Sequence, residues 1–156
     1  MTCILQTFPM PEGPQADLER DYDVRVAAFP DPEELRRLAV GSEGVIAGTE
    51  PWPRELLKEM AGTMRCISRV GTGVDSIDLE AATEAGVAVL NGPGEMSQTV
   101  AEYAVGMMWT LARRLREADS SVRIEGFAKR IVLLGNDMAG KTVGIVGFGD
   151  IGRRVA

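Results

Sequence analysis

The feature that most constrains this chain is a glycine-patterned stretch close to its end. A short run rich in β-branched residues, 143–146, is followed by glycines at positions 147, 149 and 152. The run predicts a buried parallel strand, and the glycines predict a turn into a helix whose first amides face a pyrophosphate. The alternative is an ordinary tight turn. A P-loop is disfavoured, because Arg153-Arg154 stands where that motif needs lysine and then serine or threonine.

The helix predicted after Gly152 is short, because the chain ends at Ala156. In dinucleotide-binding folds, an acidic residue about 20 positions beyond the glycines holds the ribose. That position lies outside this sequence. We therefore expect an incomplete nucleotide fold, and the choice between NAD and NADP stays open.

Charge and cysteine content exclude several classes of function. The 156 residues carry a net charge of -6, and their basic side chains occur in scattered pairs. Nucleic acids and anionic membranes are therefore poor partners. Cys3 and Cys66 lack C-x-x-C spacing, which disfavours a zinc site or a disulfide framework and fits a reducing compartment.

Two further absences in the sequence bear on location and chemistry. The apolar run at the N-terminus is too short for a signal peptide, and the longest one, 104–112, is well below the roughly 20 residues of a membrane span. We therefore expect a cytoplasmic protein. The sequence contains no histidine, the usual general acid or base near neutral pH.

Ahead of the glycine-patterned stretch, short apolar runs alternate with amphipathic segments that open on an acid or a proline. This alternation predicts an α/β fold, with a flavodoxin-like parallel-sheet domain over residues 1–95. The proline-rich stretch 9–16 is expected to be a loop. The predicted strands are residues 3–8, 24–29, 44–47, 66–70 and 87–90, and the predicted helices are residues 31–38, 52–60 and 77–85.

A longer amphipathic helix of about 20 residues is predicted from residue 97, since apolar side chains recur every three or four positions up to Leu115. Thr99 and Glu102 have capping-box spacing, so Thr99 is either a helix cap or a ligand contact. The Met and Trp side chains at 107–109 predict helix packing rather than a cofactor box. A less regular connection is expected over residues 120–137.

A second glycine turn follows the predicted strand 66–70. Gly71-Thr72-Gly73 leads into Val74-Asp75-Ser76, and exposed amides in such a turn can hold an anion. The alternative is a plain strand-to-helix turn in which Asp75 or Ser76 caps the helix.

Several separated motifs together resemble one family, the NAD-dependent D-2-hydroxyacid dehydrogenases, with the 3-phosphoglycerate dehydrogenase branch nearest. The resemblance covers most of the chain from about residue 44 to the end. It rests on the run 69–83, on Gly86-Val87, Asn91 and Ala101-Glu102, and on the glycines of 147–152.

The resemblance implies a role for each of these motifs. Thr72 and Gly73 would offer backbone amides to a substrate carboxylate, and Thr99 would lie near the nicotinamide. Residues 1–95 would be a substrate-binding domain, and residues 96–156 the truncated start of an NAD-binding Rossmann domain whose first helix contributes to a homodimer. The residues implied around the pyrophosphate are Gly147, Gly149, Asp150, Ile151 and Gly152.

Two departures from the family pattern limit what the resemblance implies. Gly48-Thr49 stands where phosphoglycerate dehydrogenases usually carry a phosphate-pairing arginine, which puts the substrate in doubt. The family's catalytic arginine, glutamate and histidine lie beyond the glycine-patterned helix, so no catalytic residue is assigned here. We expect the N-terminal portion of an NAD-dependent oxidoreductase. A non-catalytic dinucleotide-sensing protein, similar to corepressors, and a truncated remnant that assembles with another chain are the alternatives.

Overall fold

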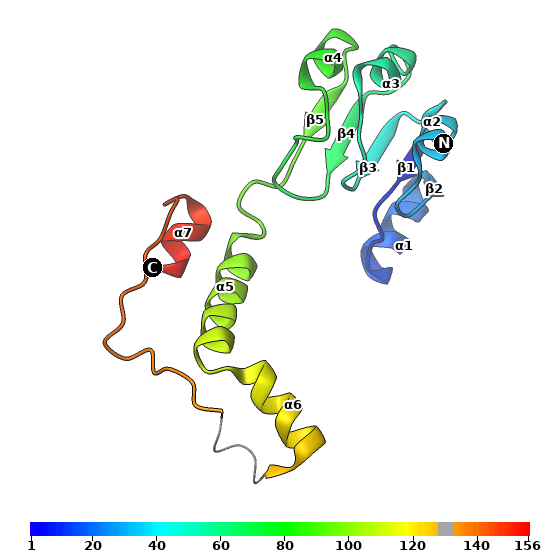
Figure 1. The fold of residues 1–156 in the computed structure, drawn as a ribbon. Coiled ribbons are helices and arrows are strands. Elements are labelled where there is room, and N and C mark those ends of the chain that lie inside the picture. Colours follow the sequence, from blue (N-terminus) through cyan, green and yellow to red (C-terminus); the bar gives the residue numbers. More distant parts are fainter. Residues whose placement is uncertain (128–132) are drawn as a thin grey trace. The chain divides into compact units, whose positions relative to one another are not determined.

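The computed structural model describes residues 1–127 and 133–156. The chain divides into two compact units, Met1–Glu95 and Met96–Ala156, and each is described by itself. Figure 1 shows their elements coloured along the sequence.

The first unit is built on one parallel sheet. Its strand order, β2-β1-β3-β4-β5, reverses between β1 and β3, as in flavodoxin-like folds. The predicted α/β class and all five predicted strands are confirmed, with the predicted bounds at β3 and with ends that differ by one to three residues in the other four. The strands are β1 (Cys3–Gln6), β2 (Asp23–Val26), β3 (Gly44–Ala47), β4 (Cys66–Arg69) and β5 (Ala88–Leu90), and the helices are α1 (Glu12–Asp21), α2 (Pro32–Ala39), α3 (Arg54–Glu59) and α4 (Leu79–Glu84).

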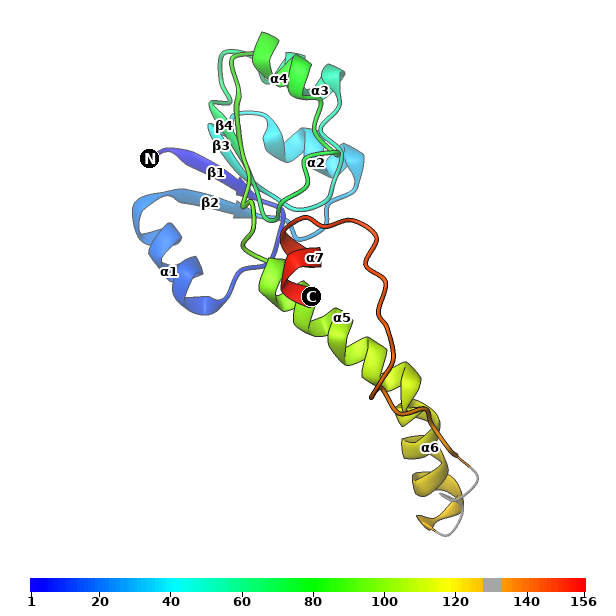
Figure 2. The same ribbon diagram turned by 90° about the vertical axis from the view of Figure 1, so that its left-hand side faces the viewer.

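The core lies between one face of this sheet and the helices α2, α3 and α4 (Figure 2). Alternate strand residues, including Leu5, Val45 and Ile67, point into it and are almost fully buried. Trp52, which precedes α3, is also fully buried there. This packing fixes the strands, and therefore the positions of the loops that follow them.

Charged side chains tie these helices together at the surface. Arg36 of α2 pairs with Glu59 of α3, and its hydrogen bond lowers the pKa of the Glu59 carboxyl. Arg54 of α3 reaches Glu80 and Glu84 of α4, at 2.8 and 2.6 Å.

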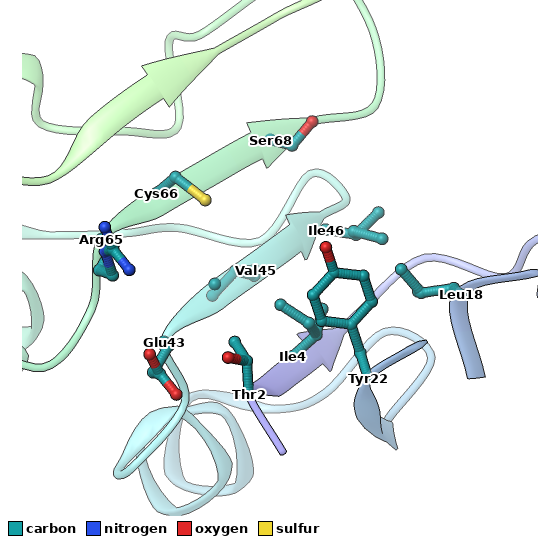
Figure 3. Close-up of a pocket in the computed structure, with 11 residues that line it drawn as sticks. Thr2, Ile4, Leu18, Tyr22, Glu43, Val45, Ile46, Arg65, Cys66 and Ser68 are labelled. Atoms are coloured by element: carbon teal, nitrogen blue, oxygen red, sulfur yellow. The ribbon is translucent and has the colours of Figure 1, made fainter. Parts of the chain in front are cut away.

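The opposite face of the sheet carries a hollow of about 520 Å³ (Figure 3). Ile4, Cys66 and Ser68 of the strands line it, together with Leu18 of α1. Its rim includes residues that precede the strands, such as Glu43 and Arg65. The hollow therefore extends along the sheet face toward the amino ends of the strands.

The loop predicted over residues 9–16 is wrong in part, because α1 begins at Glu12. Pro14 occupies the third helical position, where the backbone N–H has no acceptor within the helix, so proline is tolerated. None of the residues of α1 is buried, which explains why no apolar periodicity marks this helix in the sequence.

The second unit contains α5 (Ser97–Ala112), α6 (Leu115–Glu125) and α7 (Asp150–Val155). The single helix predicted from residue 97 is instead broken at Arg114, whose φ of 52° is left-handed. The returning chain provides a reason, since the N–H of Asn136 donates to the carbonyl of Ala112 at 2.7 Å. The connection predicted over 120–137 is likewise wrong for 120–125, which belong to α6. Residues 128–132 of that connection lie outside the described residues.

Within this unit α7 packs along α5. Arg154 of α7 donates to the side-chain oxygen of Gln98 at 3.0 Å. Val105, Met108 and Trp109 of α5 line an apolar hollow together with Ile145 and Val155. Met107 and Trp109 are 41% and 48% exposed, so the packing role predicted for the Met and Trp side chains stays a prediction. None of the described helices is long and apolar enough to cross a membrane.

The strand predicted over residues 143–146 is not formed, and the Val146 side chain is fully exposed. A strand needs the backbone groups of a neighbour, and the described part of residues 96–156 contains no other strand to supply them. The prediction of a buried strand over this run is therefore wrong.

We predict that the chain self-associates through residues 143–146 or is locally disordered there, because an exposed apolar segment with unpaired backbone groups tends to pair with another chain. Their amides should exchange with solvent rapidly in a monomer. Light scattering and hydrogen exchange test this. A clean monomer with full protection at 143–146 would contradict it.

Candidate functional site

The turn after β4, residues 71–73, is held rigidly against the segment after β5. The Thr72 hydroxyl donates to the carbonyl of Gly92 at 3.0 Å, and the Asn91 side-chain amide donates to the carbonyl of Thr72 at 2.7 Å. The N–H of Gly92 donates to the carbonyl of Gly71 at 2.9 Å. These three bonds fix a turn at the carboxyl end of a parallel strand, where ligands bind in open α/β sheets.

The N–H groups of Thr72 and Gly73 are left available by this arrangement. Both residues are exposed, and neither N–H has a hydrogen-bond acceptor among residues 1–127 and 133–156. A Cβ at Gly73 would meet only the Asp75 carboxylate, at 3.2 Å. The packing of the protein therefore does not require a glycine at position 73. A ligand that approaches the two amides closely would require one.

The helix cap predicted at Asp75 or Ser76 is wrong. The helix α4 begins at Leu79, and the Asp78 side chain accepts the N–H of Ala81 at 2.8 Å. The segment 74–77 is instead a turn of its own, in which the N–H of Ile77 donates to the carbonyl of Val74 at 3.0 Å. Asp75 and Ser76 therefore do not cap the helix. The alternative of a plain strand-to-helix turn without a ligand loses this support.

Thr99 does not cap its helix. The helix α5 begins at Ser97, so Thr99 is the third helical residue, and its side chain is exposed. The carboxylate of Glu102 instead accepts a hydrogen bond from the Gln98 side chain at 2.8 Å. The capping-box interpretation is wrong, and a ligand contact at Thr99 stays a prediction. Gln98 also contacts α7, so the first turn of α5 lies beside that helix.

The glycines of the 147–152 turn have three different environments. Gly147 adopts a left-handed φ of 91°, which side chains other than glycine rarely accept. Gly152 is buried, and a methyl group there would overlap the Gly147 carbonyl oxygen. The space beside Gly149 is open. Asp150 is the first residue of α7 and pairs with Arg153, and Ile151 follows it in the same turn.

Sequence reasoning missed Glu50, whose carboxylate is buried at the carboxyl ends of β1 and β3. Only 9% of this residue is exposed. Its Oε1 atom accepts from the Thr7 hydroxyl at 2.5 Å and from the Trp52 indole N–H at 3.2 Å. The N–H of Gly48 also donates to it, at 3.2 Å. An acid three residues after the apolar run 44–47 was the only signal in the sequence.

Arg69 is the last residue of β4. It lies within the run 69–83, but the sequence predicts no role for its side chain. Its guanidinium folds over Gly71, with Nη1 2.9 Å from where a Cβ of Gly71 would stand. Its Nε is buried and has no partner among the described residues. The end of β4 therefore carries a positive charge close to the turn with the available amides.

Comparisons with known proteins agree with this geometry. The model of the D-isomer-specific 2-hydroxyacid dehydrogenase catalytic domain matches residues 4–146. The chain belongs to this family. The resemblance inferred from the glycine turns and the run 69–83 is confirmed, and so is the coarse expectation of an oxidoreductase family that acts on hydroxy acids.

The proteins similar to this chain include enzymes that are named after different substrates. The chain is 36% identical over 155 residues to a D-3-phosphoglycerate dehydrogenase of Methanocaldococcus jannaschii, covering 99% of this chain and 29% of that protein. It is 42% identical over 98 residues to a hydroxypyruvate reductase of Thermotoga maritima, covering 63% of this chain and 32% of that protein. The chain thus spans about a third or less of these relatives.

Solved structures show the same relation. The pyruvate reductase of Chlamydomonas reinhardtii matches with a TM-score of 0.81 and 28% identity, covering 99% of this chain and 47% of that one. The D-lactate dehydrogenase from Escherichia coli matches with a TM-score of 0.80 and 29% identity, covering 99% of this chain and 50% of that one. The chain therefore spans about half the length of these structures.

Proposed function

We propose that this chain is the N-terminal part of an oxidoreductase that transfers a hydride between the CH–OH group of a 2-hydroxy acid and NAD, with NADP as the alternative cofactor. One observation carries the proposal. The turn after β4 offers the N–H groups of Thr72 and Gly73, which have no acceptor among the described residues. Two adjacent amides at the carboxyl end of a parallel strand suit a carboxylate.

In the proposed enzyme, Thr72 and Gly73 hold the substrate carboxylate and so orient C2. Thr99 lies beside the nicotinamide. The described residues fit a dinucleotide, because the left-handed Gly147 makes the turn and the space beside Gly149 is open for a phosphate. NAD, when bound, accepts the hydride from C2. The residues that hold the pyrophosphate are Gly147, Gly149, Asp150, Ile151 and Gly152.

The two compact units receive separate roles in this proposal. The unit Met1–Glu95 is the substrate-binding domain, and the unit Met96–Ala156 is the beginning of the NAD-binding domain. Exposed apolar side chains on α5, among them Tyr103 and Leu111, support a homodimer. The net charge of -6 and the absence of C-x-x-C spacing support a cytoplasmic protein without nucleic acid or membrane partners.

Hydride transfer by the protein at its full native length tests the proposal. Nicotinamide absorbance is followed with a panel of 2-hydroxy and 2-oxo acids. We expect saturable turnover with at least one small acid. A protein that turns over none of them would exclude the proposed function.

We predict that Gly73→Val raises the KM for the acid severalfold and leaves kcat less affected, because the side chain blocks approach to the two amides. The matched control is Gly13→Val, at an exposed position of α1 where a Cβ meets no atom within 4 Å. Steady-state kinetics at full native length measure both. An unchanged KM would remove Thr72 and Gly73 from the carboxylate site.

A second candidate is a non-catalytic protein that senses a dinucleotide or assembles with another chain. Dinucleotide binding without hydride transfer at full native length would select this candidate over the enzyme.

A further inference from the structure

The two strands at which the sheet order reverses end in an unusual polar cluster. The strands β1 and β3 are neighbours, with Leu5 opposite Val45 in register. Crevices at such reversal points are the usual ligand sites of open parallel sheets. In this chain Thr7 follows β1, and Gly48 and Glu50 follow β3, at this end of the sheet.

Of the two oxygens of the Glu50 carboxylate, only Oε1 accepts hydrogen bonds from the described residues. All three of its donors, Thr7, Gly48 and Trp52, bond to Oε1. The other oxygen, Oε2, is buried and has no hydrogen-bond partner in the described chain. It stands 2.9 Å from where a Cβ of Gly48 would be, so only glycine at position 48 leaves it this place.

A carboxylate oxygen buried without a partner is costly, and such groups in folded proteins call for an explanation. Packing alone does not provide one here, because an apolar side chain at position 50 would fill the space without that cost. The three donors on Oε1 keep the group in one orientation and keep its charge at the strand end.

The neighbouring strand ends in the opposite charge. Arg69 is opposite Ala47 in register, so the ends of β3 and β4 are adjacent, about 4.8 Å apart across the sheet. The guanidinium of Arg69 lies over Gly71, the residue that precedes the two available amides in the chain. The carboxyl ends of the strands thus carry a positive charge and available amides at β4, and a buried carboxylate at β3.

We infer that Glu50 is a specificity-determining residue that restricts the substrate to acids whose far end carries no phosphate. This rests on the proposed function. The carboxylate of the acid binds at the β4 end, on the amides of Thr72 and Gly73. The far end of the acid then extends across the carboxyl ends of the strands toward β3, where the buried negative charge of Glu50 repels a phosphate.

The test compares one acid with and without its phosphate, in the protein at its full native length. The rates of oxidation of D-glycerate and of its 3-phosphate ester give two values of kcat/KM. We expect D-glycerate to be preferred about tenfold, and Glu50→Gln to reduce this preference about fivefold, mainly through a lower KM for the phosphate ester. Glutamine keeps the Oε1 acceptor and removes the charge.

The matched control is Glu55→Gln, which removes one negative charge from an exposed position of α3. It should leave the preference unchanged. Thermal unfolding of each variant separates specificity from stability: a purely structural Glu50 would lower the melting temperature and leave the preference as it was, which would overturn the inference.

Two further outcomes would also overturn it. A wild-type preference for the phosphate ester would show that Glu50 does not exclude phosphate, while the hydride transfer itself would still support the proposed function. No turnover with any acid would instead remove the proposed function, and the inference with it.

Discussion

Hydride transfer by the 156-residue chain alone is expected to be undetectable with every 2-hydroxy acid. Oxidation of a C2 hydroxyl needs a base that accepts its proton, and a positioned group of this kind contributes about 10²–10⁴ in rate. The chain contains no histidine to act as that base. Thr72 and Gly73 can bind a carboxylate, but equal binding of ground state and transition state does not accelerate the reaction.

The measurement is nicotinamide absorbance with a panel of acids, on the chain purified away from the dehydrogenases of its host. Holding substrate and nicotinamide together contributes a further large factor, which depends on a closed cleft. The control is Gly149→Val, which should disable any dinucleotide site in this chain. Turnover that copurifies with the chain and disappears in Gly149→Val would show that the catalytic groups lie within these residues.

The sheet could be predicted from the sequence because its signals are local. The strand predicted over residues 44–47 matches β3 residue for residue, since a buried parallel strand is a continuous apolar run. The helix α1 could not be predicted in this way, because it buries none of its residues. The helix break at Arg114 follows Ala112, whose carbonyl accepts the N–H of Asn136. Because Asn136 lies far along the chain, the local apolar periodicity predicts one continuous helix here.

In the candidate site, too, the residues with a local sequence signal could be predicted and the others could not. Two glycines after an apolar run point to the turn at 71–73, because both turn geometry and backbone access need glycine at such a place. Glu50 could not be found from its neighbours. Its hydroxyl partner is Thr7, a residue 43 positions earlier, and an acid after a strand otherwise resembles any solvated turn. The run 143–146 shows the reverse case, where a local apolar signal forms no strand because the described part of residues 96–156 offers no partner strand.

Replacing Gly149 and replacing Gly152, the last two glycines of the 147–152 turn, should have different effects. Gly149→Ala is expected to leave the fold intact, because a Cβ there meets no protein atom within 4 Å. In the protein at its full native length it should weaken dinucleotide binding about a hundredfold, or ~2.7 kcal/mol, because the methyl group would occupy the space of the pyrophosphate. Fluorescence titration with NADH measures the affinity, and Gly13→Ala on α1 is the neutral control.

Gly152→Ala is expected to act on the protein instead. Its methyl group would overlap the carbonyl oxygen of Gly147, so the turn and the start of α7 must shift before any ligand binds. Hydrogen exchange in α7 should therefore rise in Gly152→Ala and stay unchanged in Gly149→Ala, whereas both variants lose affinity. If Gly149→Ala bound NADH as tightly as the unmodified protein, the open space beside residue 149 would not be a phosphate site. The 147–152 turn would then be an ordinary connection whose glycines serve only its own geometry.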